Sequence, residues 1–360
     1  MKGIAQNGRI HLLVLAGAGL LCLPTLSMAK VTGQCAQCHT MHNSQGGSPM
    51  AVDASGAAQS APNNVLLVKG CVACHTGTND GTNNIPFVNS TTAPTYGTDG
   101  TTGNTLAGGN FYWVASSGGA TDAAGHNVAT DSLAGADAAL GNTPPGGTAL
   151  TSQLTCAGVT GCHGDRTATS DFAAISGAHH GNDGTLDGTS VATSFRFLDG
   201  IVGLEDSDWE YQPTTTAHNQ YYGVDRTDET DPTGTISSLC AECHNDFHNG
   251  TGNVAGSTWG SPWVRHPTDF DMGNTAAGSE YRNYGGAGVN AYVVSAPVAS
   301  TDYSAVKSSV TFADDTIVTC ISCHRAHGTP NADLLRWDYS LVDAGSGNTG
   351  GCFECHTTKN

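Results

Sequence analysis

Pairs of cysteines that are followed at once by a histidine recur along the whole chain. Five of these segments have the spacing Cys-x-x-Cys-His, and they comprise Cys35, Cys38 and His39; Cys71, Cys74 and His75; Cys240, Cys243 and His244; Cys320, Cys323 and His324; and Cys352, Cys355 and His356. This spacing is typical of c-type haem attachment, in which two thiols bond to the two vinyl groups of one porphyrin and the histidine binds its iron. A single motif could also be half of a zinc site or a redox-active cysteine pair. Five motifs that all continue into histidine favour haem over both alternatives.

A sixth pair, third in chain order, has a longer spacing, because five residues separate Cys156 from Cys162 before His163 follows. A disulfide is the simplest alternative for such a pair. We favour a haem, because the histidine stands in the same place as in the other motifs and two glycines allow the longer loop to bulge. Only Cys22 of the 13 cysteines is then left unused, and it lies within the first 29 residues. The sequence therefore predicts six covalently attached c-type haems.

Each iron needs a second axial ligand on the other face of its porphyrin. Methionine is scarce beyond the first 29 residues, where only Met41, Met50 and Met272 remain. Histidine is more plentiful, and the candidates for the distal position are His42, His126, His179, His180, His248, His266 and His327. His218 is one more histidine outside the motifs, and its role stays open. The numbers fit six haems with two histidine ligands each.

Three of these candidates follow a motif closely, since His42, His248 and His327 come three or four residues after a motif histidine. If the motif continues as a helical turn, residues at this spacing lie on the same side of it. Such a histidine cannot reach the far face of its own haem and must bind the iron of another haem close by. We therefore expect neighbouring porphyrins in close contact, which is the geometry of an electron relay.

The composition excludes an ordinary core of aliphatic side chains. Charged residues make up 12% of the chain, the net charge is −18, and 48 of the 360 residues are glycine. Buried porphyrin faces can take the place of the scarce aliphatic side chains, because the stabilisation gained on burial scales with the apolar area removed from water. The stretches 76–155, 181–200 and 271–291 show neither a helical nor a strand period. We expect a mostly coil multihaem c-type cytochrome with few strands, organised around a chain of six haems, with short helices at the motifs and near 332–342.

The first 29 residues have the features of a signal peptide, with Lys2 and Arg9 before an apolar stretch and a small-x-small cleavage site before Lys30. Residues 30–360 then form a single domain without a transmembrane span, secreted through the periplasm to the cell surface or beyond. Acidic residues outnumber basic ones by 31 to 13, which argues against nucleic acid or an anionic membrane as a partner. Redox partners and extracellular electron acceptors fit this charge better.

Basic side chains near the motifs have two possible roles. Arg166, Arg196, Arg265 and Arg325 could neutralise haem propionates, or they could be ordinary solvated arginines. No serine–histidine–acid set and no phosphate-binding loop stands out, so no catalytic site is expected outside the haems.

Several segments resemble the OmcS-type hexahaem outer-surface c-type cytochromes, a family from metal-reducing bacteria that polymerises into extracellular nanowire filaments. The resembling segments are 35–44, 125–128, 240–249, 265–267 and 320–327. The resemblance implies a coil-rich protomer in which bis-histidine haems stack in alternating parallel and T-shaped pairs and conduct electrons over long distances. It also implies that His42 binds, in the adjacent protomer, the iron of the haem on Cys320 and Cys323.

The third motif departs from the family in its spacing, and the family's Asp-Pro-His-Gly is replaced by residues 177–181. There His179 or His180 takes over as ligand, although adjacent histidines can also serve two haems of a close pair. Three functions remain open: an electron conduit that polymerises outside the cell, a monomeric periplasmic or surface electron carrier, and a multihaem oxidoreductase. An oxidoreductase needs one iron with an open position. The histidines suffice to close all six irons, so we expect a non-catalytic electron conduit.

Overall fold

The computed structural model describes residues 31, 33–53, 55–115, 122–128, 141–181, 184, 186–226, 232–248, 253–254, 263–264 and 266–359. The predicted signal peptide lies outside these residues. Turns, bends and irregular loops make up most of the described chain, as the composition predicts. Regular elements stay short because stretches rich in glycine, threonine and asparagine carry no sustained apolar period.

The helices of the described chain are all short. The α-helices are α1 (Cys71–Cys74), α2 (Tyr112–Ala115), α3 (Asp171–Ala174), α4 (Ile236–Ala241) and α5 (Asn245–His248). The 3₁₀ helices are η1 (Cys35–Gln37), η2 (Asn64–Leu66), η3 (Asp122–Ala124), η6 (Ala178–His180), η7 (Val191–Thr193), η8 (Phe195–Phe197), η9 (Met272–Asn274), η10 (Glu280–Asn283), η11 (Cys320–Ser322), η12 (Ala332–Leu334), η13 (Tyr339–Leu341) and η14 (Gly351–Glu354). None of the described helices has the length and hydropathy needed to cross a membrane.

Two-stranded pairs are the largest sheets in the described residues. The pairs are β1 (Thr155–Ala157) with β2 (Gly161–His163) in parallel, and, antiparallel, β3 (Gly203–Leu204) with β4 (Gln220–Tyr221), β5 (Asn253–Val254) with β6 (Trp263–Val264), and β7 (Phe270–Asp271) with β8 (Ile317–Val318). The expectation of few strands is thus confirmed. So are helices at five motifs, in η1, α1, α4, η11 and η14, and at η12 and η13 near 332–342.

The third motif is the exception, and the expectation of a helix there was wrong. Cys156 lies in β1 and Cys162 in β2, and no helical turn joins them. Five intervening residues are too many for one turn, so the chain loops back and pairs with itself instead.

Buried apolar side chains form three separate small clusters rather than one core. The first contains Phe195 and Ile317, the second Tyr284 and Tyr292, and the third Phe111 with a few valines. The described residues therefore form no continuous aliphatic core, in agreement with the composition.

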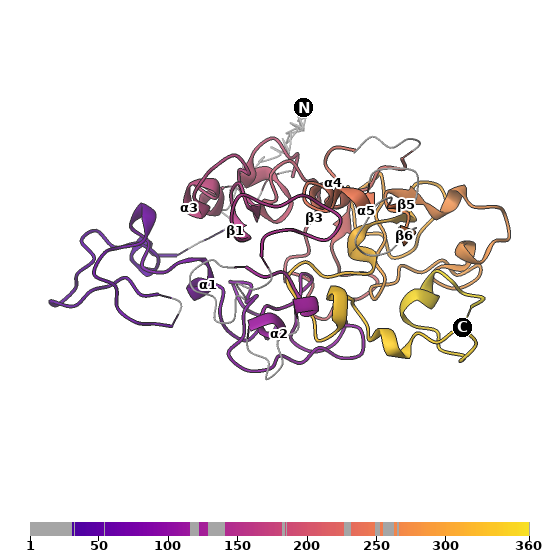
Figure 1. The fold of residues 1–360 in the computed structure, drawn as a ribbon, viewed down its shortest axis with the longest axis horizontal. Coiled ribbons are helices and arrows are strands. Elements are labelled where there is room, and N and C mark those ends of the chain that lie inside the picture. Colours follow the sequence, from indigo (N-terminus) through magenta and orange to yellow (C-terminus); the bar gives the residue numbers. More distant parts are fainter. Residues whose placement is uncertain are drawn as a thin grey trace, which may run out of the picture.

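An N-terminal arm, residues 33–53 and 55–70, extends away from the rest of the chain (Figure 1). The buried Asn43 side chain organises it, because its oxygen accepts the backbone N–H of Ala51 at 2.6 Å and its NH₂ donates to Gln59 O at 2.9 Å. Large apolar side chains are exposed on the arm, namely Met41, Val65 and Leu66. The arm thus presents apolar surface outside the clusters described above.

Candidate haem-binding sites

One helical turn shapes each of the five Cys-x-x-Cys-His motifs. In all five, the backbone N–H of the motif histidine donates to the carbonyl of the first cysteine, at 2.7–3.1 Å. Residues three and four positions apart lie on one side of such a turn, so both thiols and the imidazole point the same way. None of the twelve cysteines of the six motifs is in a disulfide. The turn therefore suits one porphyrin held by two thioethers, with the histidine at its iron.

The third motif reaches an equivalent arrangement through β structure. Strands β1 and β2 run parallel with Ala157 beside His163, which leaves Cys156 and Cys162 at matching positions one residue earlier. Adjacent strands lie about 4.7–4.9 Å apart, and matching residues of parallel strands point to the same face. Gly158 has a φ of +85°, which a residue with a side chain rarely adopts, and this conformation lets the loop close. The longer spacing thus still brings the two thiols side by side.

Backbone carbonyls fix the ring orientation of most motif histidines. The contacts of Nδ1 are His39 with Val65 O (3.1 Å), His75 with Pro86 O (2.8 Å), His163 with Arg196 O (3.0 Å), His244 with Pro145 O (2.7 Å) and His324 with Asp333 O (2.6 Å). A carbonyl only accepts hydrogen bonds, so Nδ1 carries the proton and Nε2 is left to bind a metal. In His356, Nδ1 lies instead 3.7 Å from a carboxylate oxygen of Glu280.

Five motif histidines each face a second histidine at a common distance. The ring centres are separated by 6.1 Å for His39–His180, 6.5 Å for His75–His179, 6.3 Å for His163–His327, 6.0 Å for His244–His126 and 6.3 Å for His356–His266. An imidazole bound through nitrogen at roughly 2.0–2.1 Å has its ring centre roughly 3 Å from the metal, so two rings on opposite sides of one metal lie roughly 6 Å apart. The facing pairs fit one iron each, and every partner belongs to the predicted distal candidates.

Two consecutive residues take part in different pairs. His179 faces His75 and His180 faces His39, both from helix η6. Side chains of adjacent residues on a 3₁₀ turn diverge by roughly 120°, so each ring reaches its own partner. Both histidines that the sequence offered as alternatives are therefore placed opposite motif histidines, and the first two sites lie side by side.

Burial favours the neutral form of several of these histidines. Loss of water contact disfavours the charged ring and lowers the pKa of His75, His126, His163 and His244. The same effect, reinforced by neighbouring histidines, lowers the pKa of His327 to about 3. Neutral imidazole is the form that binds a metal.

The fifth motif differs from the others, because no described histidine ring faces His324, which is solvent-exposed. His42 is also exposed, on the N-terminal arm, and no histidine ring of the described chain faces it. Within the described residues, His324 is thus a motif histidine that no histidine ring faces, and His42 and His248 are the two distal candidates that face no motif histidine.

His248 and His218 are the other histidines outside the motifs, and both contact groups other than a motif histidine. His248 Nε2 lies 2.8 Å from Asp269 Oδ2, and both side chains are almost fully buried. His218 stacks on Tyr292 with ring centres 3.8 Å apart, and its Nδ1 lies 2.8 Å from Asn219 O. The structure therefore does not bring His248, a predicted candidate, opposite a motif histidine.

Methionine has no counterpart to these pairs in the described residues. Met41 is 81% exposed, whereas Met272 is buried in the cluster around Tyr284 and Tyr292.

The described arginines near the motifs already have partners. Arg166 binds Glu242 at 2.7 Å, and Arg196 lies 3.8 Å from Glu205. Arg325 is buried and donates to Tyr96 Oη and to backbone carbonyls of 99, 100, 106 and 107. Arg265 lies outside the described residues. The arginine that the sequence reasoning missed is Arg336, which is buried beside the fifth motif with Nε on Ile321 O at 2.7 Å.

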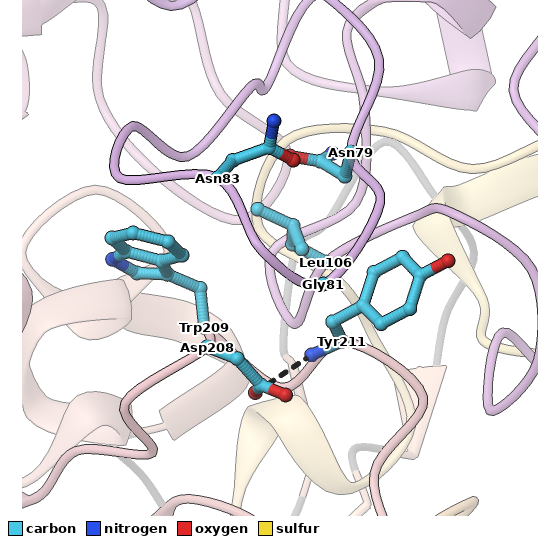
Figure 2. A pocket seen from close by; sticks show the side chains of 7 residues that line it. All are labelled: Asn79, Gly81, Asn83, Leu106, Asp208, Trp209 and Tyr211. Atoms are coloured by element: carbon cyan, nitrogen blue, oxygen red, sulfur yellow. Dashed lines mark hydrogen bonds between the residues drawn. The ribbon is translucent and has the colours of Figure 1, made fainter.

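A small recess lies apart from the motifs, between the loops around residues 79–83 and 208–211 (Figure 2). Its lining comprises Asn79, Gly81, Asn83, Leu106, Asp208, Trp209 and Tyr211. The empty space is about 140 Å³, below the roughly 300–1,000 Å³ of typical ligand pockets. It contains no motif residue and is not a haem site.

Residues 312–360, which hold the fifth and sixth motifs, match the family model for a doubled CXXCH motif. The Cys-x-x-Cys-His motif occurs three more times before this segment, and a longer variant holds Cys156 and Cys162. The chain is a multihaem c-type cytochrome with covalently attached haems.

Within this class the chain is similar to the C-type cytochrome OmcS of Geobacter sulfurreducens, as the motif segments predicted. The two are 28% identical over 95% of this chain and 88% of the relative. A solved structure described as the outer membrane cytochrome S filament from the same organism is 26% identical, with a TM-score of 0.48 and 89% of each chain covered. A second, of OmcS nanowires, is 22% identical, with a TM-score of 0.43 and coverage of 85% of this chain and 84% of that one.

Proposed function

We propose that this protein conducts electrons outside the cell through six bis-histidine c-type haems and that it polymerises into a filament that delivers electrons to extracellular acceptors. The observation that carries this proposal is the set of five histidine pairs with ring centres 6.0–6.5 Å apart. An iron with two histidine ligands has no position left for a substrate, so it can exchange electrons but cannot bind and convert a small molecule.

The pairs supply both ligands for five of the six irons. We assign His39 and His180 to the first haem, His75 and His179 to the second, His163 and His327 to the third, His244 and His126 to the fourth, and His356 and His266 to the sixth. The haem on Cys156 and Cys162 is the third, held by two paired strands. When bound, the irons supply one-electron chemistry, and the chain's own residues attach, orient and enclose them.

Contacts between neighbouring sites support a continuous path. Sites one and two are joined through the adjacent residues of η6. The fourth site's His126 has its Nδ1 2.6 Å from Ala326 O, next to the third site's His327. The fourth and fifth motifs are adjacent, because the backbone N–H of Cys320 donates to Ser237 Oγ in α4 at 3.3 Å. Closely spaced carriers are what a relay of electrons requires.

The fifth haem is completed by a second copy of the chain. His324 is exposed and has no facing histidine among the described residues, while His42 is exposed on the N-terminal arm. We assign His42 of one protomer to the iron held by His324 of the next, which repeats head to tail and builds an open filament. The similar OmcS structures are a filament and nanowires, which agrees with polymerisation.

The proposal also covers export and domain organisation. Residues 1–29 act as the signal peptide, and residues 30–360 leave through the periplasm as one hexahaem domain. Without Lys2 and Arg9 of the signal peptide, the net charge of −18 becomes −20, and it keeps the exported chain away from nucleic acid and anionic lipid.

One experiment separates this function from its alternatives. The cell-surface fraction is examined by electron microscopy, intact mass and visible spectroscopy with and without cyanide. Filaments with six haems per chain, all low-spin and indifferent to cyanide, are expected. Low-spin monomers would instead indicate a soluble electron carrier. A haem that stays high-spin and binds cyanide in the assembled protein would indicate an oxidoreductase with an open iron.

A further inference from the structure

His356 has a different partner from the other motif histidines. Its Nδ1 lies 3.7 Å from Oε1 of Glu280, whereas Nδ1 in the other five motifs contacts a neutral backbone carbonyl. In the sixth site the described partner of the motif Nδ1 is therefore a carboxylate oxygen instead of a backbone carbonyl.

Glu280 is held in this position by the end of the chain. Its other oxygen, Oε2, accepts the hydroxyl of Thr358 at 2.5 Å and the Thr358 backbone N–H at 3.1 Å. In return, the Thr357 hydroxyl donates to the backbone carbonyl of Glu280 at 2.9 Å. These bonds leave Oε1 directed at His356, so the contact does not depend on a freely rotating side chain.

The carboxylate is ionised and shielded. The hydrogen bond from the Thr358 side chain lowers the pKa of Glu280, and nearby Lys359 adds to the effect. The Glu280 side chain is 10% exposed, so water screens its charge less than on an open surface. Tyr281, the next residue, packs edge-on against His356 with ring centres 5.2 Å apart.

We propose that Glu280 is a positioning residue that lowers the reduction potential of the haem on Cys352 and Cys355 by acting through His356. This rests on the proposed ligation of that haem by His356 and His266. At 3.7 Å the Glu280 carboxylate acts on His356 through its charge rather than through a hydrogen bond. A negative charge beside the ligand stabilises ferric over ferrous iron, and the electrostatic surroundings of a haem are one of the means by which a protein sets its potential. The haem chain would then carry a step in potential at its C-terminal site.

Glu280→Gln tests the proposal, with Glu354→Gln as the matched control. The glutamine keeps the size of the side chain but removes its charge. Glu354 stands next to Cys355, so its replacement makes the same charge change near the same haem. The Glu354 carboxylate lies 3.5 Å from the Ser295 hydroxyl rather than against the imidazole.

Redox titrations and low-temperature paramagnetic resonance spectra of the intact, haem-loaded protein are compared. For Glu280→Gln we expect one haem in six to move to higher potential and one set of low-spin g-values to change. Glu354→Gln should give a smaller shift with unchanged g-values. Equal shifts in the two variants without any change in g-values, or no shift at all, would overturn the proposal.

A second variant, Thr358→Val, keeps the proposal testable if Glu280→Gln does not fold. It removes the hydroxyl that holds the Glu280 carboxylate without altering the charge. We expect the potential of the sixth haem to shift in the same direction but by less. An unchanged potential in this variant counts against the proposal. If the proposed function itself is wrong, the unmodified protein would show fewer than six haems or a high-spin sixth haem. This result differs from every outcome that tests Glu280.

Discussion

The imidazole of His327 faces that of His163, with ring centres 6.3 Å apart, although His327 stands only three residues after the motif histidine His324. The backbone N–H of His327 donates to Gly108 O at 2.6 Å, which anchors it against a distant loop. A Cβ at position 108 would lie 2.8 Å from the His327 ring, so glycine is needed for this approach. His327 therefore lies opposite the motif histidine of another site and not opposite that of its own motif.

Replacement of His42 tests assembly. In His42→Ala the arm loses the imidazole that would close the next protomer's fifth iron, while every cysteine that attaches haem stays in place. We expect six haems per chain, no filaments, and one high-spin haem that added imidazole converts to low-spin. Electron microscopy and visible spectra report these outcomes. Normal filaments with every haem low-spin would exclude His42 as the ligand across the boundary.

Replacement of His179 and His180 tests the paired sites. His179→Ala and His180→Ala should each open one iron, so each variant should show about one high-spin haem in six, and the double variant about two. His218→Ala is the control, since His218 stacks on Tyr292 and faces no motif histidine. A single variant that opens two irons, or none, would contradict the assignment of one histidine to each of the first two haems.

Replacement of Cys162 tests the longest motif. Cys162→Ala removes one of the two thioethers of the third haem, and we expect an intact mass lower by one haem or a haem lost on denaturation. The loss should also lower the melting temperature, because each buried porphyrin contributes apolar surface to the core. Cys22 lies in the predicted signal peptide, so Cys22→Ala should leave the mass of the secreted protein unchanged. An unmodified protein whose mass fits five haems and a disulfide would refute the haem at this motif.

The low pKa of His327 predicts that acid reduces the stability of the folded protein. Its pKa is about 3 in the folded chain, against about 6.5 in an unfolded one. Between these values the unfolded state binds a proton that the folded state does not, so the free energy of unfolding falls as the pH falls below about 6.5, by up to about 1.4 kcal/mol per pH unit for this group. Denaturant titrations at pH 7.5, 5.5 and 4.5 should show decreasing midpoints, and iron ligation acts in the same direction. A midpoint that stays constant down to pH 4.5 would show that the ring is protonated in the fold.

The buried guanidinium of Arg325 predicts a large effect on stability. Its removal in Arg325→Met leaves four carbonyls and the Tyr96 hydroxyl without their donor, and a buried acceptor without a partner costs about 1–3 kcal/mol. We expect the free energy of unfolding to fall by about 3 kcal/mol or more. Arg166→Met is the control, because its salt bridge with Glu242 is partly exposed and such pairs contribute about 0–1 kcal/mol. Equal losses in the two variants would contradict this view of Arg325.

Local spacing is what the sequence could predict, because an attachment motif and its helical turn occupy five consecutive residues. The haem class and the coil-rich fold both follow from such local patterns. The third motif shows the limit of this reasoning, since its cysteines come together only through strand pairing between β1 and β2.

Long-range partners could not be predicted in the same way. Nothing near His248 distinguishes it from His327, because Asp269, which binds it, and His163, which faces His327, lie in other parts of the chain. The burial of Arg336 and the contact of Glu280 with His356 likewise depend on how distant loops fold together.

The proposed pairing imposes an order on the maturation of the protein. If the chain emerges from its N-terminus, His126 and His266 are present before the motifs that they serve, so the fourth and sixth irons can be closed as soon as those haems are attached. The third iron must wait with His163 alone until His327 has emerged near the C-terminus. A truncated chain would therefore carry attached haems whose irons still have an open, reactive position. Synthesis of the C-terminal segment supplies the histidine that closes the third iron.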